Sequence, residues 1–117
     1  MKKSEAYVLS GVLGKASSKS LGKKDVIEYI KLKLLLKKEC ELIEEFRENL
    51  VDSLGGGDDS EEGIVKFKET FSAYLSEDSQ GDIDSRIFTV DKMADFIKGN
   101  DFSPEEESHL ISKMVKE

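Results

Sequence analysis

The sequence has no tryptophan and only one proline, one histidine and one cysteine. A single cysteine, Cys40, excludes an intramolecular disulfide, and one histidine leaves no zinc site of Cys and His ligands. No apolar run approaches the ~20 residues that a transmembrane helix needs. The apolar stretch near the start is interrupted by Glu5, Ser10 and Gly11, which argues against a signal peptide. We therefore expect a cytoplasmic protein, in a bacterium or an infected cell, with virion association as a further option.

Acidic residues are scarce in the first third of the chain, and basic residues are outnumbered in the rest. Residues 1–38 hold ten lysines and three acids, whereas residues 39–117 hold eight basic and twenty-two acidic residues. The first part has no arginine, the usual base reader, and only Tyr7 and Tyr29 as aromatic residues for stacking. Direct nucleic-acid binding is therefore not expected, and the 117 residues predict a single domain spanning 1–117.

The longest predicted element is a helix over residues 23–54. Apolar residues recur there at helical spacing without an internal glycine or proline: Tyr29, Leu32, Leu36, Cys40, Ile43, Phe46, Leu50 and Leu54. A second apolar set occupies the first half and predicts broad burial there: Val26, Ile27, Ile30, Leu34 and Leu35. The helix is basic at its start and acidic at its end, opposite to what the helix dipole favours. Packing must therefore stabilise it.

Four shorter helices are predicted over 4–14, 60–75, 90–98 and 103–115, the last two forming a C-terminal pair that ends near residue 116. Ser60 and Thr89 are suitable N-caps, and Ser103-Pro104-Glu105-Glu106 combines a cap, a helix-starting proline and a capping box. Glycines 55–57 should reverse the chain, so that the 60–75 helix pairs with the long helix as a hairpin. Residues 83–88 form either a short extended segment or a loop. The expected fold is all-α, with three shorter helices around this hairpin.

No pattern in the sequence predicts a catalytic, cofactor or metal site, or a small-molecule substrate. His109 lacks the partners that catalysis or metal binding requires, and Cys40 lies on an apolar stripe far in sequence from that histidine. The loop starting at Asp78 resembles a calcium loop only in part, because Ile83 stands where glycine is needed and Thr89 where glutamate is needed. A divalent-cation site in the acidic loops is thus left open.

Three segments resemble small helical proteins that are encoded in structural gene modules of bacteriophages and prophages. They are Phe71-Ser-Ala-Tyr-Leu-Ser-Glu-Asp, Phe88-Thr-Val-Asp-Lys-Met-Ala-Asp-Phe-Ile and Phe102-Ser-Pro-Glu-Glu-Glu. The similarity lies in the overall plan, a short apolar segment, a long Lys/Glu-rich helix and a C-terminal helical pair, and it contains no diagnostic motif. It implies a phage-associated role and assigns no functional residue.

We expect a non-enzymatic protein-interaction module, an assembly or accessory component of a phage or prophage, that pairs with a protein or with itself through the long helix. The residues expected to form this seam, either within one chain or between copies, are Leu32, Leu36, Cys40, Ile43, Phe46 and Leu50. The alternative is an acidic decoy that inhibits a nucleic-acid-binding or host-defence enzyme. Its expected contact is the acidic patch formed by Glu105, Glu106 and Glu107.

Overall fold

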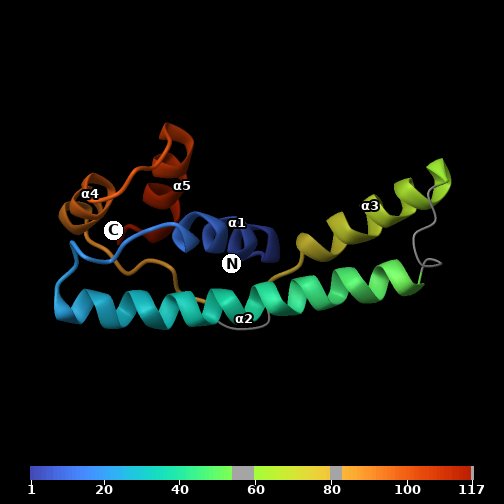
Figure 1. Ribbon diagram of the computed structural model, residues 1–117, viewed down its shortest axis with the longest axis horizontal. Helices are drawn as coiled ribbons and strands as arrows, with labels where there is room; N and C mark the ends of the chain where they lie inside the picture. The colour runs from blue at the N-terminus through green and yellow to red at the C-terminus, as the bar shows by residue number, and fades with distance from the viewer. Residues whose placement is uncertain (54–59, 80–82, 117) are drawn as a thin grey trace.

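The computed structural model shows an all-α protein, as the sequence predicts (Figure 1). It describes residues 1–53, 60–79 and 83–116. The helices in these ranges are α1 Lys3–Gly14, α2 Lys23–Ser53, α3 Glu61–Leu75, α4 Val90–Lys98 and α5 Pro104–Met114. The expected end of the long helix at Leu54, the turn at Gly55, Gly56 and Gly57, and the loop residues Gln80 and Asp82 lie outside the described residues.

The predicted caps begin three of the helices. The hydroxyl of Ser60 accepts a hydrogen bond from the N–H of Gly63, and that of Thr89 accepts one from Lys92. At α5 the capping box is complete, since Ser103 Oγ accepts from the N–H of Glu106 and the Glu106 carboxylate accepts from the N–H of Ser103. These short polar side chains satisfy N–H groups that a helix start leaves without partners.

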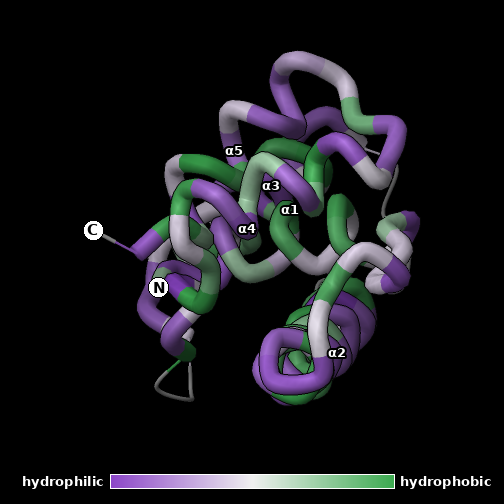
Figure 2. The backbone as a smooth tube through the Cα atoms, turned by 90° about the vertical axis from the view of Figure 1, so that its left-hand side faces the viewer, coloured by the Kyte–Doolittle hydropathy of each residue, from purple (hydrophilic) through white to green (hydrophobic). Residues whose placement is uncertain are grey.

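The long helix α2 sets the shape of the molecule. Its 31 residues span about 46 Å at 1.5 Å per residue, close to the full 50 Å extent of the protein. The radius of gyration is 16.7 Å, well above the ~13 Å of a compact domain of about 100 residues. Both views place α2 along one edge, with the other helices to one side of it (Figures 1 and 2). One face of α2 is therefore left open along its length.

The main core lies where α1 packs along α2 and where α4 and α5 close over them. Phe96 of α4 is fully buried at its centre, with ring centroids 5.3 Å from Phe88, 5.5 Å from Tyr29 and 5.8 Å from Phe102. Aliphatic residues of α1, α2 and α5 fill the remaining space: Leu9, Leu13, Leu32, Leu36, Leu110 and Met114. Tilted aromatic contacts at these distances add to the stabilisation that burial provides.

The prediction of broad burial in the first half of α2 is wrong. Ile27, Ile30, Leu34 and Leu35 are 54%, 49%, 61% and 43% exposed. The cause is geometric, because α1 packs along α2, and Phe96 of α4 contacts Tyr29, on the side that carries Tyr29, Leu32 and Leu36.

Helix α3 returns along α2, as the predicted hairpin requires, but the two helices diverge towards the start of α3 (Figure 1). None of its residues is fully buried, and Ile64 and Val65 in its first turns remain 44% and 47% exposed. The aromatic face of α3 thus contacts α2 mainly near its C-terminal end, where Tyr74 meets Phe46.

The segment between α3 and α4 is attached to both ends of the described chain. Lys2 forms an antiparallel bridge with Asp78, and Phe88 forms a parallel bridge with Val115. Phe88 donates its N–H to the carbonyl of Met114 and accepts a bond from the N–H of Lys116. The option of an extended segment at 83–88 is therefore realised only as an isolated bridge, because the described residues contain no strand.

Candidate interaction surface

The inward face of α2 holds the residues expected to form a seam. Leu32, Leu36, Ile43 and Leu50 are buried within the single chain, and Cys40 and Phe46 are half-buried. Leu32 and Leu36 belong to the main core with α1. Of the two arrangements left open by the sequence, these residues adopt the internal one. A partner of α2 therefore needs a different face.

The outward face of the first half of α2 combines aliphatic and basic side chains. Its exposed aliphatic residues recur at i, i+3 and i+7 from Ile27 to Leu34, on the side opposite Tyr29, Leu32 and Leu36. Exposed lysines surround them, namely Lys23, Lys24, Lys31, Lys37 and Lys38. Among the described residues, the one ion pair of these lysines joins Lys31 to Glu28 at 3.7 Å, and both side chains are exposed. We call this surface the basic stripe: Ile27, Ile30, Leu34, Leu35 and the five lysines.

The outward face of the second half of α2 has the opposite charge. It presents exposed acids at helical spacing, namely Glu41, Glu45, Glu48 and Asp52. Leu42, half-buried, lies beside them. We call these four acids and Leu42 the acidic stripe. It continues the basic stripe along the same open edge, so one uninterrupted helix face changes sign midway.

A second unusual group joins α1, α2 and α3. The rings of Phe46 and Tyr74 are stacked, with centroids 3.6 Å apart and planes 2° from parallel. The Nζ of Lys3 lies 4.1 Å from the Tyr74 centroid and 3.3 Å from a carboxylate oxygen of Glu77. Lys3 is only 3% exposed, so its charge depends on the aromatic face and this carboxylate. The cluster fixes the C-terminal end of α3 to the rest of the protein.

The predicted acidic patch is partly used inside the chain. Glu106 accepts a hydrogen bond from Lys15 at 2.7 Å and closes the α5 capping box. These bonds, that of Lys15 foremost, lower the pKa of the Glu106 carboxyl. Glu105 is exposed and Glu107 half-buried. The three side chains therefore do not act as one free anionic surface, because the middle one joins α5 to the end of α1.

His109 lies on α5 in a partly buried position. Burial lowers the pKa of its imidazole, the nearby charge of Lys113 lowers it further, and Glu5 opposes the shift. Glu5 and Lys113 form an ion pair, whose hydrogen bond lowers the pKa of Glu5. The Nε2 atom of His109 is buried and has no hydrogen-bond partner among the described residues. This arrangement favours a neutral, partly buried His109, and Glu5 is paired with Lys113 rather than with the histidine.

Two surface hollows gather acidic side chains without forming a site. One, of about 410 Å³, lies where Ser10 of α1 faces Cys40 and the acids that follow it on α2. Next to it, Tyr7 donates a hydrogen bond to Glu44 at 3.0 Å, which raises the pKa of the Tyr7 hydroxyl. Cys40 lies half-buried at the wall of this hollow.

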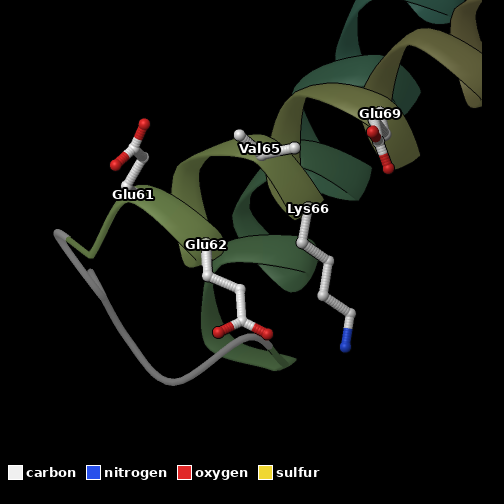
Figure 3. Close-up of a pocket in the computed structure, with 5 residues that line it drawn as sticks. All are labelled: Glu61, Glu62, Val65, Lys66 and Glu69. Atoms are coloured by element: carbon white, nitrogen blue, oxygen red, sulfur yellow. The ribbon is translucent and has the colours of Figure 1, made fainter.

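The other hollow lies on the first turns of α3 (Figure 3). Glu62 and Lys66 extend on one side of the helix, whereas Glu61, Val65 and Glu69 lie away from them and do not converge on a common point. Within the described ranges, no three His, Cys, Asp or Glu side chains are grouped as metal ligands would be. No helix in the same ranges is long and apolar enough to cross a membrane.

The basic stripe is the surface that sequence reasoning missed. Its pattern is visible in the sequence, because aliphatic residues and lysines share one helix face there and Glu28 is the acid beside them. Periodicity predicts these aliphatic residues as core, because it shows that a face is apolar but not what covers it. Comparison of the chain with family models, curated proteins and solved structures found no match.

Proposed function

We propose that this protein is a non-enzymatic protein-interaction module that binds its partner through the outward face of α2. The observation that carries the proposal is the basic stripe, where four large aliphatic side chains, each at least 43% exposed, lie on one helix face. Aliphatic residues scattered singly over a surface need no explanation, but an apolar patch rimmed by charge is typical of a binding site. The opposite face of α2 is closed by the core.

The distribution of polar groups supports a binding role rather than a catalytic one. His109 is flanked by a closed Glu5–Lys113 ion pair, and Cys40 is half-buried next to carboxylates. Catalysis by side chains requires reactive groups that converge on one point. The resemblance to phage and prophage structural modules extends the proposal to an assembly or accessory role.

The test is a triple variant, Ile27→Ser with Ile30→Ser and Leu34→Ser. Because these side chains are exposed, the variant should fold normally, as circular dichroism will show. We expect it to lose association measured by light scattering of the purified protein and by affinity capture with quantitative mass spectrometry. The matched control is Val90→Ser with Ile111→Ser, two aliphatic residues of similar exposure on α4 and α5. Identical association of both variants and the wild type would refute a binding role for the stripe.

The second candidate function is the acidic decoy, which the acidic stripe favours. Its acids are exposed and recur at i, i+4, i+7 and i+11 from Glu41, so they present a line of negative charge. A decoy would bind a basic, nucleic-acid-binding protein in a salt-sensitive manner. Glu41→Lys with Glu48→Lys would abolish this binding, whereas the triple serine variant would leave it unchanged. Glu105→Lys with Glu107→Lys is the control for nonspecific charge effects.

A further inference from the structure

The two stripes are complementary to each other. The basic stripe carries five lysines, with Glu28 beside Lys31 as the acid at its edge, whereas the acidic stripe carries four acids and no base. Both lie on the same open face of one helix, at the edge of the molecule opposite to the core (Figure 2). Within one helix they meet only at their junction, where Glu41 follows Lys37 and Lys38 by one turn. A second helix of the same sequence, laid antiparallel on this face, would bring each stripe against its complement.

We propose that the partner of this face is a second copy of the protein, and that the two α2 helices pair antiparallel about a two-fold axis near Lys38. The inference rests on the proposed function and identifies the partner. A two-fold axis makes the contact isologous, so each contact between unlike residues occurs twice. The surface is then self-complementary in charge, which fits closed pairing rather than open-ended assembly.

A register centred on Lys38 places basic residues of one copy opposite acidic residues of the other at two positions, each occurring twice. Leu34 lies opposite Leu42 of the second copy, which joins an exposed aliphatic residue to a half-buried one. Lys31 lies opposite Glu45 of the copy, and Lys24 opposite Asp52 of the copy. Lys38 meets its own counterpart at the axis, where Glu41 of each chain, one turn away, supplies the opposite charge.

The helix dipole favours the same arrangement. The lysines at the start of α2 and the acids at its end oppose the dipole of their own helix. In an antiparallel pair, the lysines of one copy lie beside the negative end of the other helix, and the acids lie beside its positive end. The charge pattern that disfavours the isolated helix therefore favours the pair.

Other partners match only part of the face. A parallel copy would place lysines against lysines and acids against acids. An anionic surface would attract the basic stripe but repel the four acids that continue it, and an acidic helix of another protein would have the same conflict. The antiparallel copy satisfies both stripes at once.

The test is a charge exchange measured by sedimentation velocity over a range of protein concentrations and salt. We expect wild-type protein to dimerise, more weakly as salt rises. Lys31→Glu alone and Glu45→Lys alone each turn two symmetric attractions into repulsions and should raise the dissociation constant about tenfold. The double variant, Lys31→Glu with Glu45→Lys, should restore the wild-type dissociation constant. Lys68→Glu, an exposed lysine on α3 away from the face, is the matched control.

A cross-link gives a second measurement that does not depend on charge. In a Cys40→Ser background, Lys38→Cys should link to itself across the axis with a short bis-maleimide, and Lys68→Cys should not. A strict monomer at high concentration would overturn the inference, as would a dimer that the double variant fails to restore. If the wild type is monomeric while the triple serine variant still loses a different partner, the proposed function stands and the second copy does not.

Discussion

The two ends of α2 are the same helix in different surroundings. At one end, which we call the packed end, residues of α1, α4 and α5 bury Tyr29, Leu32 and Leu36 in the main core. At the other, the hairpin end, α2 beyond Lys38 is paired with α3, which contributes no fully buried residue. Ile43 and Leu50 are buried there, outside the main core. One continuous helix therefore joins a well-packed region to a sparsely packed one.

This difference shows that apolar residues at helical spacing identify the inward face of a helix, but do not reveal how stable each part of that helix is. The inward stripe is continuous from Tyr29 to Leu50, yet the number of elements that cover it falls along its length. Most helical stability in proteins comes from packing of an apolar face rather than from intrinsic propensity. The free energy of opening should therefore be high at the packed end and low at the hairpin end.

The largest expected effect is at the packed end. Phe96→Ala removes a fully buried ring that contacts three other aromatic residues, and should lower the free energy of unfolding by about 3–5 kcal/mol. Urea denaturation followed by circular dichroism measures the loss. Val65→Ala in α3 is the matched control at the hairpin end and should change stability by at most about 0.5 kcal/mol. Equal losses would contradict the contrast between the two ends.

An intermediate effect is expected where α3 is attached. Tyr74→Ala removes the stack with Phe46 and the aromatic face beneath Lys3, costing about 1 kcal/mol or more. We expect faster amide hydrogen exchange in α3 and unchanged exchange in α4 and α5. Tyr74→Phe keeps the ring and should behave as the wild type. If exchange in α4 and α5 also accelerates, the two ends unfold as one unit.

The smallest effect concerns pH. Burial keeps the pKa of His109 below its usual 6.5, so the unfolded chain binds a proton before the folded chain as the pH falls. Neutral His109 makes its full contribution to the free energy of unfolding at pH values above the pKa that it has in the unfolded chain. This contribution is lost as the pH falls towards the lower pKa that it has in the folded protein. The urea midpoint should therefore fall between pH ~7.5 and pH ~5.5, and fall less in His109→Gln. The same pH dependence in both proteins would assign it to other groups.

The sequence predicted those parts of the fold that depend on local chemistry. Ser60, Thr89 and Ser103 begin their helices as expected, because a cap acts within three residues along the chain. The all-α class and the direction of the hairpin also followed from periodicity. Whether Leu34 faces the core or solvent depends on where α1, α4 and α5 pack, which local pattern does not encode.

The other features that the sequence did not predict also depend on contacts between residues far apart in the chain. Lys3 is buried because it meets Tyr74 and Glu77, more than seventy positions along the chain. Asn100, just beyond α4, bonds the backbone of Ser17 through its side chain, more than eighty positions away along the chain. The residues predicted to form the seam on α2 are buried or half-buried within the chain, and the proposed interaction surface lies on the opposite face of the same helix.

The attachment at Tyr74 has a mechanical consequence. Beyond Lys38, α2 continues for about 22 Å, so a tilt of about 10° at its base would move its tip by about 4 Å. Helix α3 runs obliquely towards the middle of α2, where its C-terminal end is held by the contacts of Tyr74 with Phe46 and Lys3 (Figure 1). A small tilt of α2 near these contacts would therefore produce a larger displacement at the C-terminal end of the helix.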